Sequence, residues 1–429
     1  MSRTCIIVSP YFPPSTLAGV HRARHLAKHL PAAGWVPTIL CVDEACHEQR
    51  LDPALATLVP TTVNVVKVSA LPARLCRPFG FGEISLRAWQ PLRSALFRLL
   101  ATRPIDAVLI TGSPYYPMLL SGEIKRRFRV PVILDFQDPW VSVEGATRPK
   151  WSKGGVAHQL AVALEPRAVS HSSFITSVSD TQNAHMAYMY PWLDSSRMAA
   201  IPIGGDPEDS DALRSSPQLN QELGLDPERI NLSYVGTFLP RAAPLVRQVF
   251  HAMRVLRETQ PSLVARVRLN FVGTSNQPTY SGPGLVMPLA IEAGIADLVV
   301  ESPQRVPFLN ALGILANSDG LLLIGSDEPH YTASKIYPAL MSGRPFLSLF
   351  HSASSAHQIL SAAGGGRSFS FSDAGELLAL QSELAKALFD LATQPESFGR
   401  ADPAAYDVFT ARSVARQFAN VFDRVAGGL

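Results

Sequence analysis

Short apolar runs alternate with helix-length amphipathic segments along the whole chain, and this alternation limits the possible folds more than any other sequence feature. Apolar runs of roughly four to eight residues bounded by turn residues are typical of buried strands, and amphipathic segments between them are typical of crossover helices. The pattern therefore predicts an α/β fold built from βαβ units. In the first half we expect strands at 5–8, 38–42, 63–68, 106–111, 130–136 and 173–178, with helices that include 19–33, 86–101 and 117–128.

The second half repeats this pattern after a polar segment, 204–229, that is rich in Pro, Asp and Ser and reads as a linker. The expected strands there are 230–236, 266–273, 297–302, 320–325 and 344–350, and a helical stretch at 409–426 ends the chain. We therefore expect two Rossmann-like, doubly wound domains that face a cleft. Their predicted bounds are 1–205 and 206–408, followed by a C-terminal helix within 409–429.

Composition excludes several classes of protein. The 429 residues are 47% hydrophobic and 17% charged, which suits two well-cored domains, and a net charge of +3 is too small for a dedicated nucleic-acid binder. We see no signal peptide and no run of 18 apolar residues, so we expect a cytoplasmic protein without a membrane span. The four cysteines (Cys5, Cys41, Cys46 and Cys76) form no C-x-x-C motif, and we expect Cys5 and Cys41 to be buried in strands.

Two loops of the first domain offer candidate site residues. Gly19 lies between a Pro-rich turn and a basic helix, where the backbone could approach a ligand at the helix start, although an ordinary β–α turn fits as well. Asp135 and Asp138 follow a buried strand, and acids at the carboxyl end of a parallel strand point toward the ligand crevice or cap the next turn. His21, His25 and His29 are spaced by four, but they span about 12 Å along a helix. A solvated face is therefore favoured over a metal site.

Residues 74–103 hold six arginines against one acid, beside a helical stripe of Trp89, Leu92, Leu96 and Leu99. One interpretation is a surface that rests on anionic lipid head groups. The other is a helix that packs its stripe on the sheet and leaves the arginines in water.

The second domain offers a pattern suited to a phosphate. Gly236, Thr237 and Arg241 lie just past a strand, where backbone N–H groups and a guanidinium could approach a diphosphate. Farther on, Ser334 and Lys335 precede Pro338, and proline is comfortable only in the first turn of a helix. The helix is therefore expected to start beside Ser334 and Lys335, with Thr332 or Ser334 as its cap. The amides of Lys335, Ile336 and Tyr337 would then be unpaired.

Several motifs together resemble a known family. SPYFPPSTLAG, DFQDPW, SVSD, IPIGGD, YVGTF and ASKIYPALMSGRP are similar, in this order, to motifs of the GT-B-fold glycosyltransferases, and within them of the retaining family 4. The resemblance implies a nucleotide-sugar donor on the C-terminal domain, an acceptor on the N-terminal domain and metal-independent transfer with retention. It places the diphosphate at Gly236, Thr237, Arg241, Ser334, Lys335 and Ile336, and the nucleobase at the stretch Pro303, Gln304, Arg305 and Val306. Gly19 falls near the acceptor and the leaving phosphate.

Two positions depart from the family pattern. The family has two glutamates eight positions apart, and here Pro338 and His330 occupy those places. Asp327 and Glu328 lie close to His330, the place of the first glutamate, and could contact the donor sugar instead. The catalytic candidates are Asp138, Glu328 and His330. No residue is an obvious ribose ligand. The leading hypothesis is a transferase acting on a polysaccharide, lipid-linked or small-molecule acceptor, with no cofactor or metal and peripheral contact with an anionic membrane. The alternatives are a non-catalytic partner protein with a degenerate donor site and, less favoured, a sugar-nucleotide epimerase.

Overall fold

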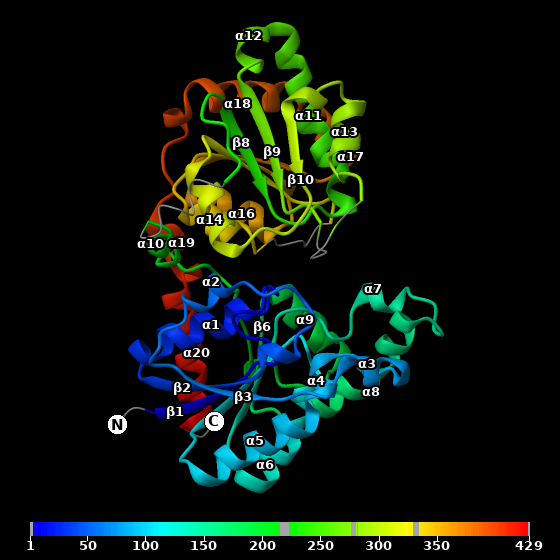
Figure 1. Ribbon diagram of the computed structural model, residues 1–429, viewed down its shortest axis with the longest axis vertical. Coiled ribbons are helices and arrows are strands. Elements are labelled where there is room, and N and C mark those ends of the chain that lie inside the picture. Colours follow the sequence, from blue (N-terminus) through cyan, green and yellow to red (C-terminus); the bar gives the residue numbers. More distant parts are fainter. Residues whose placement is uncertain (1–2, 215–222, 276–279, 281, 329–333, 428–429) are drawn as a thin grey trace. The chain divides into compact units, whose positions relative to one another are not determined.

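The computed structural model describes residues 3–214, 223–275, 280, 282–328 and 334–427 (Figure 1). The chain forms two units: residues 1–203 together with 411–429 make unit 1, and residues 204–410 make unit 2. The sequence placed these boundaries at 205/206 and 408/409. No helix among the described residues is long and apolar enough to cross a membrane.

Unit 1 is built on a seven-stranded sheet in which every strand pair is parallel. The strand order, β3-β2-β1-β4-β5-β6-β7, is that of a doubly wound fold. Six strands match the expected ones, and the three-residue β7 was not predicted. The strands are β1 (Arg3–Val8), β2 (Trp35–Val42), β3 (Asn64–Val68), β4 (Ala107–Gly112), β5 (Val132–Phe136), β6 (Phe174–Ser177) and β7 (Met198–Ala200).

Helices cover both faces of this sheet, so successive residues of a strand enter different cores. Ile6 and Val8 pack with Leu92, Leu96 and Leu99 of α5 (Trp89–Thr102). The apolar stripe of that helix is therefore core, and the lipid-facing interpretation of the stripe is wrong. The other helices are α1 (Val20–His29), α2 (Pro53–Ala56), α3 (Ala73–Cys76), α4 (Ile84–Arg87), α6 (Ser121–Phe128), α7 (Val143–Ala146), α8 (Lys153–Val169) and α9 (Asp180–Met189).

The opposite face of the same sheet is covered by α1 and by the last helix of the chain, α20 (Ala411–Ala426). In Figure 1 this helix, drawn in red, lies among the blue first elements of the chain. Phe418 and Phe422 are fully buried there with Cys5 and Ile7 of β1. Cys5 and Cys41 are both buried in strands, as predicted, and all four cysteines are free thiols.

Unit 2 repeats the architecture with a six-stranded parallel sheet in the order β10-β9-β8-β11-β12-β13. Five strands were expected; β13, which begins at the last of three consecutive glycines, was not. The strands are β8 (Ile230–Val235), β9 (Val267–Val272), β10 (Val299–Ser302), β11 (Gly320–Ile324), β12 (Phe346–His351) and β13 (Gly366–Phe371).

Helices α11 (Ala243–Thr259), α12 (Pro261–Val264), α13 (Met287–Glu292), α17 (Ala374–Ala379) and α18 (Gln381–Thr393) contribute to one continuous core of unit 2 that includes Leu232, Val249, Phe271 and Leu388. The other helices of this unit are α10 (Asp209–Arg214), α14 (Phe308–Asn317), α15 (Ile336–Met341), α16 (Ser355–Ala363) and α19 (Pro403–Tyr406). Part of the predicted linker 204–229 is therefore helical. The buried side chain of Leu213 in α10 lies against α14 at Gly313.

Candidate functional site

The carboxyl ends of β8 and β11 and the start of α15 bring the main candidates of unit 2 together. Gly236, directly after β8, has φ +137°, which favours glycine. A Cβ there would lie 3.0 Å from Lys335 Cδ and 3.9 Å from Lys335 Nζ. The glycine thus lets the lysine side chain lie directly against the backbone of the loop. Thr237, the next residue, is exposed, and its carbonyl oxygen accepts a hydrogen bond from the Tyr234 hydroxyl at 2.8 Å.

The ammonium group of Lys335 is held without a carboxylate. Its Nζ lies 3.8 Å from the centroid of the Tyr234 ring, a cation–π contact. No ion pair or hydrogen bond to this group is present within the described residues. Desolvation lowers the pKa of Lys335 to about 7, because the surrounding protein disfavours the charged form. An anion placed beside it would restore the charged form.

The structure corrects the predicted start of α15. The helix begins at Ile336, after Lys335, and it has no side-chain cap, so capping by Ser334 is wrong. The Tyr337 amide is paired as well, since it donates to the Ser334 carbonyl at 3.3 Å. Pro338 is the third residue of the helix, within the first turn as predicted. Thr332 and His330 lie outside the described residues.

Arg241 lies between two carboxylates rather than free. Its Nε donates to Asp327 Oδ1 at 2.6 Å, and its Nη1 donates to Glu328 Oε1 at 2.8 Å. These bonds raise the pKa of the guanidinium. All three side chains are about half exposed, so water screens the pairs and each contributes little to stability. The arrangement brings the predicted phosphate ligand and the predicted sugar ligand into direct contact.

The stretch predicted to meet a nucleobase follows β10. Pro303 accepts a hydrogen bond from the Ser275 amide at 2.9 Å, which ties this loop to the one after β9. Arg305 and Val306 are half-buried just before α14. Desolvation lowers the pKa of the Arg305 guanidinium, and no acid partner is present for it among the residues that the structure describes.

Glu301 supports these loops from within β10, a role that no sequence pattern indicated. Its carboxylate accepts bonds from the amides of Leu285, Val286 and Met287 and from the Thr274 hydroxyl, all at 2.6–3.0 Å. The loop after β9 is therefore fixed at both of its ends by one side chain.

In unit 1, Gly19 and Asp138 lie at the same edge of the sheet. Gly19 precedes α1, and its carbonyl accepts a hydrogen bond from Gln137 Nε2 at 3.2 Å. Its backbone is in the ordinary helical region, so no conformational need for glycine exists there. Asp138 is exposed on one side, yet the neighbouring protein desolvates its carboxylate and raises its pKa. A carboxylate with a raised pKa accepts a proton more readily than an ordinary aspartate does.

Asp135 is not placed to contact an acceptor. Its carboxylate is fully buried and accepts bonds from Arg22 Nε at 3.1 Å, Thr111 Oγ1 at 2.7 Å and Thr176 Oγ1 at 2.8 Å. Arg22 continues the network to the carbonyl oxygens of Ile201 and Pro202. The predicted role on the acceptor side is therefore wrong for this residue, and its role is structural.

Gln137 and an aromatic group were missed at this edge. Gln137 is buried and its Nε2 also donates to Thr111 Oγ1 at 2.7 Å. Trp140 stacks on Tyr115 with ring centroids 5.4 Å apart and meets Tyr116 edge-on. The sequence offered a signal, since two tyrosines follow one strand and a tryptophan follows the next.

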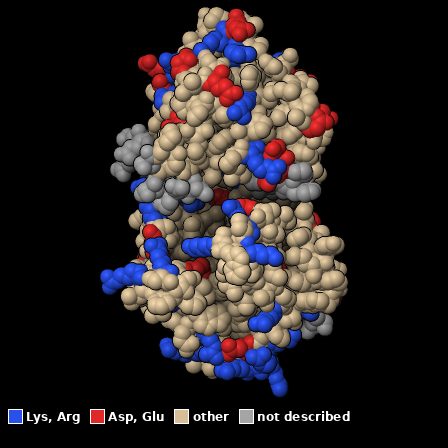
Figure 2. Space-filling view, turned by 90° about the vertical axis from the view of Figure 1, so that its right-hand side faces the viewer, with Lys and Arg blue, Asp and Glu red and all other residues tan. Residues whose placement is uncertain are grey.

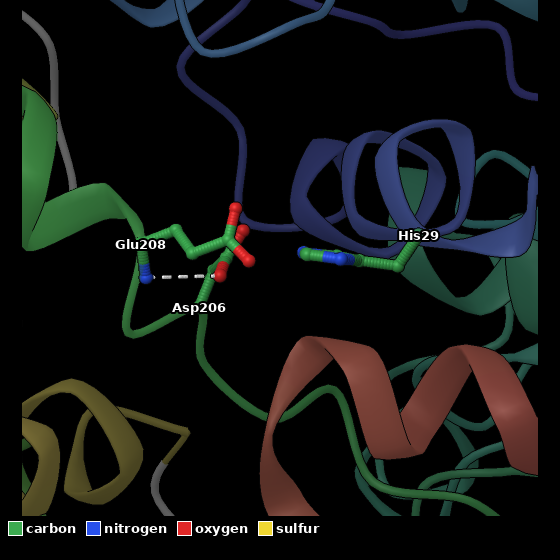
Figure 3. A group of neighbouring side chains, drawn as sticks. All are labelled: His29, Asp206 and Glu208. Carbon is green, nitrogen blue, oxygen red and sulfur yellow. Dashed lines mark hydrogen bonds between the residues drawn. The ribbon is translucent and has the colours of Figure 1, made fainter. Parts of the chain in front are cut away.

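The structure also describes the histidines of α1 and the turn at the start of unit 2. His25 is buried, with its Nε2 2.9 Å from Arg24 Nη2, so the expected solvated face is wrong there. In unit 2, the Glu208 amide donates to Asp206 Oδ1 at 3.1 Å, the bond marked in Figure 3. This bond caps the turn that leads into α10. His29, drawn in the same figure, is the last residue of α1.

Comparisons with known proteins agree with this architecture. Residues 18–204 match the family described as "Glycosyl transferase 4-like domain". A search of curated protein sequences gave no match.

Solved structures that resemble the chain cover nearly all of it at low identity. They include Anabaena HepE in complex with UDP and glucose (15% identity, 98% of this chain and 99% of that one, TM-score 0.59). WaaG, a glycosyltransferase of lipopolysaccharide biosynthesis, is 14% identical over 97% and 99% (TM-score 0.60), and trehalose 6-phosphate synthase from Burkholderia multivorans is 14% identical over 100% and 97% (TM-score 0.61). The fold that the motifs implied is confirmed. The chain therefore has the GT-B fold, and residues 18–204 within its first unit are similar to the glycosyl transferase 4-like domain.

Proposed function

We propose that the protein is a glycosyltransferase that moves a sugar from a nucleotide-diphosphate donor to a glycan, lipid-linked or small-molecule acceptor. The observation that carries this proposal is the Lys335 ammonium, desolvated and without a carboxylate partner among the described residues, against the glycine loop after β8. A cation kept in such a place stabilises an anion that is brought to it. The domain match in unit 1 and the UDP and glucose bound by the structurally similar HepE support the same reading.

The donor is proposed to lie at the carboxyl edge of the unit 2 sheet. Gly236 and Thr237 approach the diphosphate with their backbone, and Lys335 and Arg241 neutralise it, with Ser334 and the Ile336 amide beside them. Asp327 and Glu328, which hold Arg241, contact the sugar. The base meets the stretch from Pro303 to Val306, where Arg305 has no acid partner among the described residues.

Catalysis is proposed to be charge stabilisation without a metal. Negative charge grows on the diphosphate as the glycosidic bond breaks, and Lys335 and Arg241 stabilise it more in the transition state than in the ground state. At the acceptor side, Asp138 holds the attacking hydroxyl or takes its proton, with Gly19 nearby. Retention at the anomeric carbon is part of the proposal and is read from the stereochemistry of the product.

A thermal-shift screen with UDP, GDP, dTDP and CMP sugars tests the donor site. We expect one of these to raise the melting temperature, because a ligand that binds only the native state stabilises it. Lys335→Ala should weaken binding of that donor by about 1.5–3 kcal/mol, the cost of a lost charge-assisted bond. Lys386→Ala is a matched control, because Lys386 is an exposed lysine of the same unit that pairs with Asp390. Unchanged binding in Lys335→Ala would contradict the phosphate role.

The alternative is a non-catalytic GT-B protein that acts as a partner of another transferase. Pro338 supports it, since it stands where the related enzymes have a glutamate. The two proposals separate on turnover: the alternative predicts that no donor is consumed, by transfer or hydrolysis, even where a nucleotide raises the melting temperature.

We place the working protein in the cytoplasm, at the inner face of a membrane that carries the acceptor. The motivation is the basic character of unit 1, in which Arg126, Arg127 and Arg129 add to the arginines of 74–103. Fractionation of cells that express the protein tests this: recovery in the membrane fraction at low salt and release by high salt are expected for electrostatic attachment.

A further inference from the structure

The segment 71–81, which follows β3 in unit 1, exposes four large apolar side chains and contains no acidic residue. Leu71 and Leu75 are each 60% exposed, Phe79 is 75% exposed and Phe81 is 57% exposed. Burying such side chains elsewhere would be favourable, so a contiguous set of them in water marks an interaction site. Arg74 and Arg77 lie between them in the sequence.

This segment is fixed at its base. The Leu71 amide donates to the Arg87 carbonyl at 3.1 Å, and the buried Arg87 returns a bond from Nη1 to the Leu71 carbonyl at 2.7 Å. Arg77 is paired with Glu48 at 2.7 Å, whereas no partner for Arg74 is present in the described part of the chain. The exposed side chains are therefore presented by an anchored turn.

A second segment of unit 1 has the same character. Trp151 is 95% exposed and lies between Lys150 and Lys153, neither of which has an ion partner among the described residues. The helix that follows, α8, exposes Val156 and Leu160, one turn apart, and contains no Asp, Glu, Lys or Arg from Gly154 to Leu164.

The two segments leave the same edge of one sheet. One follows β3 and the other follows β5, and the carboxyl ends of parallel strands share an edge. Figure 2 views the side on which Figure 1 shows α3, α7 and α8. On the part of that view formed by unit 1, a broad surface without charged side chains is bordered by Lys and Arg more than by Asp and Glu. We call residues 71–81 and 150–160 the apolar–basic edge.

We infer that the apolar–basic edge docks on the surface of a bilayer that contains anionic lipid. Phe79, Phe81 and Trp151 enter the interfacial region, where aromatic side chains are favoured, and Arg74, Lys150 and Lys153 contact the head groups. Basic residues alternate with aromatic residues along this edge. A bilayer with anionic lipid fits that pattern better than a protein groove, because it offers anionic head groups next to its apolar region at every point. The inference extends the proposed function, since Asp138 and Trp140 follow the same strand and would face an acceptor held in that bilayer.

Vesicle flotation tests the inference on the full chain. We expect binding to vesicles of phosphatidylcholine with phosphatidylglycerol and little binding to phosphatidylcholine alone. The double variant Phe79→Ser/Phe81→Ser should bind at least tenfold more weakly, and Arg74→Ser should cost about fivefold, the usual worth of one basic residue near such a surface. Leu378→Ser is the matched control, because Leu378 is 62% exposed in unit 2. Its binding should equal that of the wild type.

Three outcomes would overturn the inference: equal binding to both kinds of vesicle, no binding to either, or full binding by the double variant. A wild-type dimer in solution that the double variant loses, without vesicle binding, would instead assign the edge to a second copy of the chain. All variants are first checked for an unchanged melting temperature. The donor screen on the same proteins separates the two proposals, since vesicle binding without any nucleotide shift would reject only the donor site.

Discussion

The titration of Lys335 makes donor binding depend on pH. In the free protein its pKa is about 7, and a bound diphosphate raises that pKa, so binding above neutral pH takes up a proton. Affinity should therefore be highest below about pH 7 and fall as pH rises, by as much as tenfold per unit until the pKa of the complex is reached. Calorimetry with the intact nucleotide sugar measures this, because its diphosphate has no proton to lose near neutrality.

Lys335→Arg provides the control for that titration. A guanidinium stays charged throughout the range, so this variant should bind with little dependence on pH. If the wild type showed the same flat profile, the ammonium would not be the titrating group. A steep profile in both proteins would point to another residue of the site.

Arg241, Asp327 and Glu328 form exposed ion pairs whose loss should barely affect stability. We predict that Glu328→Gln leaves the affinity for a nucleoside diphosphate unchanged or up to about threefold tighter, because one competitor for Arg241 is removed. Transfer should fall strongly, since the proposed sugar contact is lost. Glu292→Gln is the matched control, as it removes a comparable exposed pair with Arg247 and should change neither property. Weaker diphosphate binding in Glu328→Gln would contradict the idea that Glu328 competes with the diphosphate for Arg241.

At the scale of the element, Pro338 sets both the position of α15 and its chemistry. It occupies the first turn, at the position where the resemblance to the family 4 glycosyltransferases implies a glutamate that binds ribose. We predict that the wild type binds its nucleotide and the 2′-deoxy analogue almost equally. Pro338→Glu should favour the ribose form about tenfold, the worth of a bond to a charged group. Pro338→Ala, which makes the same backbone change without a carboxylate, should show no such preference.

The Arg22–Asp135 pair joins α1, β4, β5 and β6 through buried bonds. Asp135→Asn replaces an oxygen that accepts these buried bonds with an amide NH2, and because a buried donor left unsatisfied costs about 1–3 kcal/mol, the substitution should lower the free energy of unfolding by about that amount. The midpoint of denaturant unfolding measures this. The affinity of the folded protein for the donor should stay unchanged. A loss of donor binding without a loss of stability would show that Asp135 takes part in the binding site after all.

Elements with strong hydrophobic patterns were predictable, and those whose pattern is set by tertiary contacts were not. The fully buried β4 and β11 fall where the sequence placed them, because both faces of a parallel sheet are covered and the strands are mostly apolar. The strands β7 and β13, with sequences MAA and GRSFSF, are short or glycine-led and depend on their neighbours for pairing.

The same division applies to the candidate site. Gly236 was predictable as a glycine that directly follows a strand, and Lys335 was predictable because Pro338 limits where the next helix can begin. The pairing of Arg241 with Glu328, which lies 87 residues along the chain, and the burial of Asp135 by Arg22, 113 residues away, follow only from the tertiary fold. Local spacing carries no information about such partners.

At the scale of the molecule, the two ends of the chain belong to one unit. Unit 1 contains residues 1–203 and 411–429, so its core is complete only when the last helix has been made. Val414, Phe418 and Phe422 of α20 are fully buried against α1 and β1. Each such side chain contributes about 1.5–3 kcal/mol when buried, which is a large part of the stability of a domain.

A chain that ends at Thr410 should therefore lose the fold of unit 1 and keep that of unit 2. Removing α20 exposes one apolar face of the first sheet, and we expect this variant to aggregate or to lose hydrogen-exchange protection in β1 and β2, while β8 and β9 stay protected. Adding a peptide of residues 411–429 in excess should restore protection, and the same peptide with Phe418→Ser and Phe422→Ser should not. Hydrogen exchange read strand by strand distinguishes these results. Full protection of β1 in the shortened chain would mean that unit 1 folds without its terminal helix.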